Sequence, residues 1–234
     1  AVVWMMINGG EATNSAVSEL SGMLRKESIV IDASNSIYTD SMENYSKMKS
    51  KGIYYLDVGC AGGPEDLTRG VALMVGGDES AFRKVEGILR AVSGNGTYGY
   101  VGGSGCGHKT KLVHNGIFYG IMPVYSEGIG LLMKLDESGP QSNMDMGEAL
   151  RLLAASPPIT TDIMDAIARV HREGSIPNDA PAAKISDMVK WESEKAAELG
   201  ADLGITNAIL RGYPSMSGKS RIIYYSAKRI ITGH

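Results

Sequence analysis

The chain has 234 residues, of which 43% are hydrophobic and 21% charged, and its formal net charge at pH 7 is -3. This length is enough for one large domain or two modest domains with a real core. The charge balance and the lack of a long Lys/Arg cluster argue against nucleic acid as a partner. Only two cysteines occur, and the apolar start from Val2 to Ile7 lacks the basic leader of a signal peptide. We therefore expect a reducing compartment, the cytoplasm.

Short apolar runs alternate with helical patterns up to about residue 105. Strands are predicted at Val2–Ile7, Ser28–Ile31, Tyr54–Val58, Val71–Val75 and Tyr98–Val101. Helices are predicted at Thr13–Arg25, Asp40–Ser50 and Asp78–Ala91. The side-chain oxygens of Thr13, Asn14 and Ser15 are candidate N-caps for the first helix, and that of Asp78 is a candidate N-cap for the third. Strands rich in Val, Ile and Met that alternate with helices indicate an α/β fold with a largely parallel sheet, covered on both faces.

A different pattern begins after Gly107. Residues Lys109 to Leu135 form one long helical stretch that is apolar almost all round, which predicts a helix buried within a domain. A membrane span is the competing interpretation, but the polar residues inside the stretch, Lys111 and Glu127 among them, argue against it. Pro123 is expected to kink this helix. Further helices are predicted at Asp145–Ala155, Thr160–Arg172, Ala182–Leu199, Ile205–Arg211 and Ser217–Ile231.

The long helix opens with a glycine-rich turn, and the free N–H groups of such a turn favour an anion. Lys111 lies just inside the helix and shares one face with His114, Asn115 and Phe118. Burial of a lysine among apolar neighbours lowers its pKa, which is how a lysine becomes a general base near neutral pH. The alternative is that Lys111 reaches out to the surface and that Asn115 caps a neighbouring loop.

Two more segments carry polar or glycine residues directly after predicted strands, at the edge of the sheet where α/β folds bind ligands. One runs from Asp57 to Pro64 and contains the glycine pair Gly62-Gly63, whose amides can touch a carboxylate; a simple tight turn is the alternative. The other runs from Asn35 to Asp40. Asn35 can bind a ribose or a substrate hydroxyl, or it can cap the next helix.

Four motifs in this order resemble the 6-phosphogluconate dehydrogenase family, within the wider β-hydroxyacid dehydrogenase group. They are Asn35-Ser36-x-Tyr38-x-Asp40-Ser41, Tyr55-Leu56-Asp57-Val58-Gly59-x-x-Gly62-Gly63, Gly70 with Met74-x-Gly76-Gly77, and Gly105-x-Gly107-His108-x-x-Lys111-x-Val113-His114-Asn115-Gly116-Ile117-x-Tyr119-Gly120. The tail, Lys228-Arg229 with Gly233-His234, resembles the family's closing segment. The resemblance implies the later part of a Rossmann-type doubly wound sheet in residues 1–105 and an all-helical substrate-binding and dimerisation domain in residues 106–234.

The family oxidises the 3-hydroxyl of 6-phosphogluconate with NADP or NAD and then releases carbon dioxide. By resemblance, Lys111 is the general base and Asn115 is the second catalytic residue. The implied substrate-binding residues are Asn35, Gly62, Gly63, His114, Tyr119, Lys228 and His234. The implied cofactor-binding residues are Asn8, Gly9 and Asn35, and no metal ion is expected. In the family the tail residues reach a neighbouring subunit, so Lys228 and His234 imply a homodimer.

The sequence departs from the family in three respects. It starts at what would be the fourth strand, without the Gly-x-Gly-x-x-Gly turn, so we expect a fragment or a truncated product. Phe118 stands where the family has its general-acid glutamate. Ala61 replaces a serine before the glycine pair, and the stretch Ile159–Asp162 has no counterpart of the family's phosphate-binding arginine. Three hypotheses remain: an authentic family member, a relative that oxidises another β-hydroxy acid without decarboxylation, or a non-catalytic descendant.

Overall fold

The chain divides into two compact units, Ala1–His114 and Asn115–His234. The computed structural model describes residues 1–62, 70–137, 143–157, 161–173, 187–199, 204–212 and 218–232. The division between the units falls inside the long helix α4, Cys106–Glu137. The predicted boundary between residues 105 and 106 places it at the start of that helix.

The first unit is an α/β sheet of the Rossmann type. Its five strands are β1 (Val2–Met5), β2 (Ile29–Asp32), β3 (Tyr54–Ala61), β4 (Ala72–Gly77) and β5 (Tyr98–Gly102). They lie side by side in sequence order, and all neighbours are parallel except β3 and β4. The three helices are α1 (Glu11–Met23), α2 (Tyr38–Ser50) and α3 (Glu79–Ser93).

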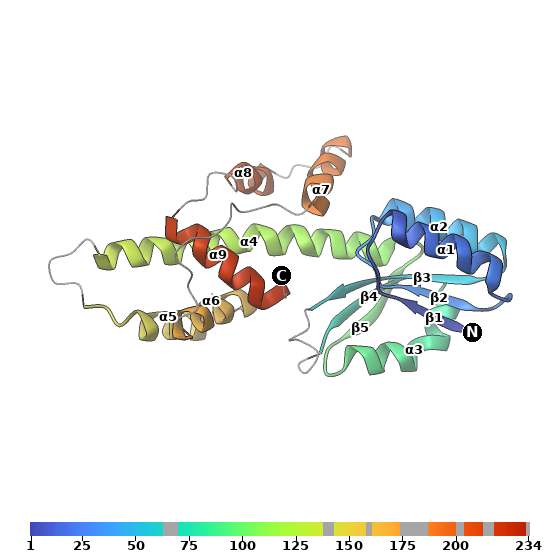
Figure 1. The fold of residues 1–234 in the computed structure, drawn as a ribbon, viewed down its shortest axis with the longest axis horizontal. Helices are drawn as coiled ribbons and strands as arrows, with labels where there is room; N and C mark the ends of the chain where they lie inside the picture. Colours follow the sequence, from blue (N-terminus) through green and yellow to red (C-terminus); the bar gives the residue numbers. More distant parts are fainter. Residues whose placement is uncertain are drawn as a thin grey trace. The chain divides into compact units, whose positions relative to one another are not determined.

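Helices cover both faces of this sheet, as predicted: α1 and α2 lie on one face and α3 on the other (Figure 1). Successive strand residues point to opposite faces, so each strand supplies two cores. Leu56 and Val58 of β3 pack in the cluster that contains α3 residues, whereas Tyr55 packs in the cluster with Met48 of α2. The near-continuous apolar runs of the sequence reflect this burial from both sides.

The strand β3 is longer than predicted, and its added residues pair with the antiparallel neighbour β4. The expected strand ended at Val58, but the structure continues it to Ala61, where residues from Val58 onward pair only with β4. Antiparallel neighbours can be joined by a short connection, whereas parallel ones need a crossover of a dozen residues or more. The glycine at position 59 is therefore part of a strand and not of the loop that follows it.

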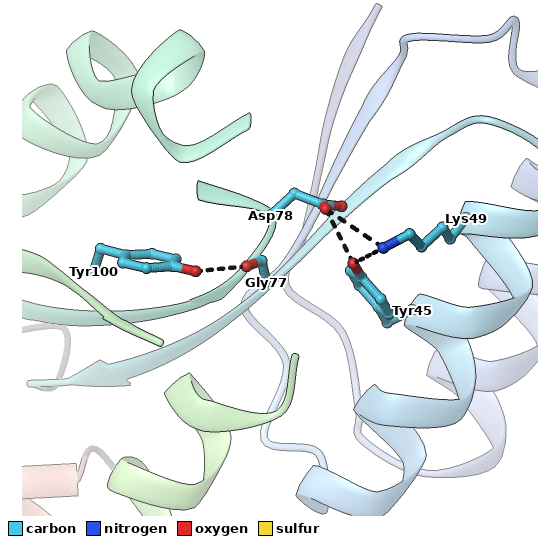
Figure 2. A network of polar contacts seen from close by, with 5 residues as sticks. All are labelled: Tyr45, Lys49, Gly77, Asp78 and Tyr100. Carbon is cyan, nitrogen blue, oxygen red and sulfur yellow. Dashed lines mark hydrogen bonds and ion pairs between the residues drawn. The ribbon is translucent and has the colours of Figure 1, made fainter. Parts of the chain in front are cut away.

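The side-chain caps predicted for the helices do not form. Helix α1 begins earlier, with Gly10 at its N-cap, and the Thr13 hydroxyl donates instead to the Asn8 carbonyl and lies 3.1 Å from Ser34 Oγ. Asp78 does occupy the N-cap position of α3, but it makes no side-chain cap hydrogen bond. Its carboxylate accepts the Tyr45 hydroxyl at 3.0 Å and lies 4.0 Å from Lys49 Nζ, which links the end of β4 to α2 (Figure 2).

The second unit is helical throughout its described residues. After the later part of α4 come α5 (Met146–Ala155), α6 (Asp162–Arg172), α7 (Asp187–Glu198), α8 (Gly204–Gly212) and α9 (Gly218–Thr232). Within the described residues these bounds confirm the predicted helices, and residues 182–186, where one of them was expected to begin, lie outside the described residues. Its core is a cluster in which Met122 and Ile129 of α4 contact residues of α5, α6 and α9. Helix α4 runs on through Pro123 without interruption.

The prediction that this helix is buried within a domain holds for only one side of α4. One side carries buried residues such as Leu112, Met122 and Ile129, but another side exposes a stripe of aliphatic residues. The stripe consists of Val113, Ile117, Ile121, Val124, Leu131 and Leu135, which are 38 to 60% exposed. By length and composition alone, α4 is the one helix in the described part of the chain that would be long enough to cross a membrane, a test that core helices of soluble proteins also pass.

Candidate active site

The first turn of α4 is held by a carboxylate from the sheet. Asp57, in the middle of β3, is fully buried. Its Oδ1 accepts the Gly105 N–H at 2.7 Å and its Oδ2 accepts the His108 N–H at 2.9 Å. These amides belong to the group that a helix start leaves without intrahelical partners. The anion expected at this glycine-rich turn is thus, in this structure, a side chain of the protein itself.

Lys111 follows one turn later and lies against the extended part of β3. A β-carbon at Gly59 would come within 2.5 Å of Lys111 Cβ and 2.8 Å of the Gly107 carbonyl oxygen. The lysine stem therefore crosses the strand where no side chain separates the two backbones. Sequence analysis assigned Gly59 only to a glycine-rich segment, because nothing in the sequence shows which glycine meets the helix.

The Lys111 side chain is half-buried, and burial lowers the pKa of its ammonium group to about 8. The Cys60 thiol has a smaller, opposing effect on this pKa. Desolvation penalises the charged form, so a low pKa is the expected result for an amine that is withdrawn from water. This favours the general-base interpretation over the alternative in which the amine reaches bulk solvent. Lys111 Nζ also lies 3.4 Å from His114 Nδ1, within hydrogen-bond distance.

The pKa of Lys111 predicts the pH dependence of any reaction that needs its neutral amine. At pH 7 only ~10% of the amine is unprotonated when the pKa is about 8. We expect kcat/KM to rise about tenfold per pH unit below pH 8 and to level off above it, since a general base acts in its deprotonated form. Initial rates of substrate oxidation between pH 6 and 10 measure this. A flat profile across pH 8 would rule out Lys111 as the titrating base.

The predicted cofactor-binding residues meet at the ends of β1 and β2. Gly9 follows β1 and touches the Asn35 backbone so closely that a β-carbon at Gly9 would overlap the Asn35 carbonyl. Asn35 itself is exposed, and it does not cap α2, whose N-cap residue is Ile37. Asn8 is exposed on the same turn. Among the predicted carboxylate-binding glycines, Gly62 directly follows β3 and is exposed, whereas Gly63 lies outside the described residues.

A buried polar network underlies this strand edge, and sequence analysis missed it. Asp32, fully buried at the end of β2, accepts the Tyr55 hydroxyl at 2.6 Å and the Ser34 N–H at 3.0 Å. Burial and the adjacent Asp32 raise the pKa of the Tyr55 hydroxyl far above its usual value, so it stays a donor. The available signal was an acidic residue within each of two otherwise apolar strands, Asp32 and Asp57, and these two residues are directly paired in the sheet.

The second unit contains the other predicted site residues. Asn115 and Phe118 follow on α4, and the Phe118 ring packs partly buried against the core of this unit. Tyr119 lies under Lys228 of α9 in the same chain, with Lys228 Nζ 5.7 Å from the ring centroid. Burial lowers the pKa of Lys228 and raises that of Tyr119. The sequence alone did not predict that these two residues meet. His234 lies outside the described residues.

Comparison with known sequences finds a family that is similar to most of the first unit. Residues 1–102 match the family described as the NAD binding domain of 6-phosphogluconate dehydrogenase. The Bacillus subtilis protein YqeC, which is named for 6-phosphogluconate dehydrogenase, is 39% identical over 131 residues, 56% of this chain and 44% of that protein. A decarboxylating 6-phosphogluconate dehydrogenase of Raoultella planticola is 29% identical over 242 residues, 99% of this chain and 53% of that protein. The chain thus spans about half the length of the curated relatives it matches.

Solved structures share the fold. The 6-phosphogluconate dehydrogenase of Plasmodium falciparum has a TM-score of 0.77 and 24% identity, over 96% of this chain and 48% of that one. The 3-hydroxyisobutyrate dehydrogenase of Mycobacterium tuberculosis has a TM-score of 0.71 and 19% identity, over 98% of this chain and 79% of that one. Both confirm a Rossmann-like sheet followed by helices. Residues 1–102 of this chain are thus similar to the NAD binding domain of 6-phosphogluconate dehydrogenase.

Proposed function

We propose that the chain forms part of an NAD(P)-dependent dehydrogenase that oxidises the 3-hydroxyl of 6-phosphogluconate with loss of carbon dioxide. The observation that carries this proposal is Lys111: a half-buried amine with a pKa of about 8, on a helix whose start is fixed to the nucleotide-domain sheet. Relatives named for this reaction match nearly the whole chain at 29% identity.

In the proposed reaction the neutral Lys111 amine takes the proton of the substrate hydroxyl. NAD(P), when bound, accepts the hydride from the same carbon. Asn8, Gly9 and Asn35 are positioned to hold the cofactor, because they lie at the carboxyl ends of parallel strands and Gly9 keeps the backbone open there. The contact between Lys111 Nζ and His114 Nδ1 orients the lysine amine. Through the same contact Lys111 can pass the proton that it has taken from the substrate to the His114 ring.

The proposed substrate contacts are assigned residue by residue. We propose that His114 and Asn115 bind substrate hydroxyls and that the Gly62 backbone binds the carboxylate. Tyr119 and Lys228 are the proposed phosphate contacts. In support of the last assignment, the half-buried Lys228 lies over the Tyr119 ring, so that a cation and a phenol, both able to donate to an anion, stand on neighbouring helices.

A second candidate function is oxidation of a different β-hydroxy acid without decarboxylation. Phe118 favours it: an aromatic ring that packs against the core of the second unit cannot protonate the enediol that remains after carbon dioxide leaves. The ring also makes an edge contact with Tyr119, with 5.2 Å between centroids, so the position is built into the apolar packing. Under this candidate Lys111 keeps the same role and the product is the keto acid.

The two candidates differ in what they release. We expect NAD(P)H formation from 6-phosphogluconate, with one carbon dioxide per reduced cofactor under the first proposal. Under the second, smaller β-hydroxy acids are oxidised faster and no carbon dioxide appears. Initial-rate assays that follow NAD(P)H absorbance and released carbon dioxide together measure both. If no substrate in the panel reduces either cofactor, the chain is a non-catalytic descendant.

The variant Phe118→Glu separates the candidates further. The substitution puts a carboxylic acid at a position where the Phe118 ring packs against the core of the second unit. If the native protein oxidises without decarboxylation, we expect Phe118→Glu to release carbon dioxide from 6-phosphogluconate at a measurable rate. Phe118→Leu is the control, because it makes the same loss of aromatic packing without adding an acid. Equal carbon dioxide release from both variants would contradict a role for the acid.

We also propose that the protein is a homodimer whose contact includes the aliphatic stripe of α4. Its members recur at spacings of three, four and seven residues, as in the seam of a helix pair, and a second copy offers the same seam. The double variant Val124→Lys/Leu131→Lys is expected to weaken self-association by about tenfold or more. Sedimentation velocity measures this, with the exposed Ile88→Lys on α3 as control. A native protein that stays monomeric at all concentrations would contradict the proposal.

A further inference from the structure

Asp57 is surrounded by backbone that only glycine allows. A β-carbon at Gly76, its neighbour on β4, would lie 2.7 Å from Asp57 Oδ1. A β-carbon at Gly107, in the first turn of α4, would lie 3.0 Å from Asp57 Oδ2 and would overlap its main-chain carbonyl. Both sides of the carboxylate are therefore closed by backbone. The side chain has no room to move, and the two amides that it accepts are fixed relative to β3.

The same helical turn has a second attachment, to α2. Ser41 Oγ lies 2.6 Å from His108 Nδ1, and both side chains are buried. Ser41 Oγ also lies 3.3 Å from the Ile37 carbonyl oxygen, which holds the hydroxyl at the start of α2. Lys109 Nζ lies 4.9 Å from the centroid of the Tyr38 ring at the start of α2. The first turn of α4 is thus held from two sides, by Asp57 of the sheet and by residues of α2.

Both attachments act one turn before Lys111. His108 contributes its backbone amide to Asp57 and its ring to Ser41, and Lys111 follows it on the next turn of α4. A shift of the first turn therefore moves the Lys111 stem off Gly59, which it contacts directly. The Lys111 stem has little space on the side that faces Gly59. A small movement of the first turn of α4 therefore changes how far the Lys111 amine is withdrawn from water.

We propose that Asp57 is a positioning residue: through its two amide contacts at the start of α4 it holds the Lys111 amine in its desolvated place. The buried Ser41–His108 contact is the second attachment. The inference concerns where the amine lies, and its relevance to catalysis rests on the proposed function. Asp57 itself does not touch the reacting atoms in this scheme.

The test replaces Asp57 by asparagine and follows the Lys111 amine directly. Asparagine has nearly the same shape, but its amide nitrogen is a donor and opposes one of the two N–H groups that the carboxylate accepts. The control is Asp32→Asn: Asp32 is also fully buried and is the partner of Asp57 in the sheet register, but its contacts are Ser34 and Tyr55. The readout is the pH titration of ¹³C-dimethylated lysines by NMR, assigned with Lys111→Arg.

We expect the Lys111 titration to move upward by about one pH unit or more in Asp57→Asn, because a displaced amine regains water. Asp32→Asn should leave it within about 0.3 unit of the native value. Ser41→Ala should shift it in the same direction as Asp57→Asn but less, and this variant keeps the test available if Asp57→Asn fails to fold. An unchanged titration in both Asp57→Asn and Ser41→Ala overturns the proposal.

Activity measurements separate this proposal from the proposed function. If the native protein oxidises a β-hydroxy acid, Asp57→Asn should lower kcat with little change in KM and should move the pH profile together with the NMR titration. If the native protein oxidises none, the proposed function fails. The NMR shift then still decides whether Asp57 positions the amine, because it needs neither substrate nor cofactor.

Discussion

Replacing Lys111 by methionine is expected to lower kcat/KM by about 10²–10⁴-fold while making the protein more stable. The loss of activity is the contribution that a positioned general base makes to proton transfer. The gain in stability has the opposite origin, since a half-buried ammonium group costs free energy that an apolar side chain of similar length does not. A variant that merely misfolded would lose both activity and stability.

The stability effect of Lys111 has a defined pH window. The pKa of its amine is about 8 in the folded protein, below the ordinary value of 10.5. The unfolded chain therefore binds more protons between these two values, and the native protein gains stability as pH rises from 8 to 10.5. Below pH 8 the penalty is fully present, at most ~3 kcal/mol for this shift. We expect Lys111→Met to raise the free energy of unfolding at pH 7 by about 1–3 kcal/mol.

Urea titrations at pH 7 and pH 10 measure this difference, together with steady-state kinetics on the same samples. The matched control is Lys134→Met, which removes an exposed lysine from the same helix. It should change the free energy of unfolding, and the activation free energy that corresponds to kcat/KM, by no more than about 0.5 kcal/mol each. Lys111→Met with native kcat/KM would end the general-base assignment. Equal activity loss in both lysine variants would point to a general charge effect.

Adding one methyl group at Gly59 is expected to cost both activity and stability. The new β-carbon would come within 2.5 Å of Lys111 Cβ, a distance that forces the helix or the strand to move. Overpacking of this kind costs about 1–3 kcal/mol. A displacement of the base by roughly 1 Å can lower kcat about 10²-fold. We therefore expect Gly59→Ala to combine these two losses, in contrast to Lys111→Met.

The control for Gly59→Ala is Gly87→Ala, in the middle of α3. A β-carbon there meets nothing within 4 Å, and alanine favours a helix over glycine by up to about 1 kcal/mol. We expect Gly87→Ala to raise the melting temperature slightly and to leave activity unchanged. Thermal unfolding and initial rates on both variants check this. If Gly59→Ala behaves like Gly87→Ala, the close approach of β3 and α4 is not a feature of the protein in solution.

The order of strands and helices in the first unit was predictable because its signals are local. Apolar runs such as the one that becomes β2, and the helical pattern of α3, report burial and periodicity within a few residues of themselves. Lys111 could be singled out for the same reason, since a glycine-rich turn, a helix start and a lysine stand close together in the chain. The exposed aliphatic stripe on α4 could not be predicted from the sequence, because apolar composition does not show which side of a helix packs against other elements.

The sequence by itself determined an α/β sheet followed by helices, and a lysine one turn into the long helix as the candidate base. Only the tertiary structure decided that β4 runs antiparallel to β3, that Asp57 holds the start of α4, and that Gly59 lies under Lys111. The contacts of α4 with Asp57 and Gly59 join residues about fifty positions apart. Their distances depend on how strands and helices pack, and the pKa of the Lys111 amine follows from that packing.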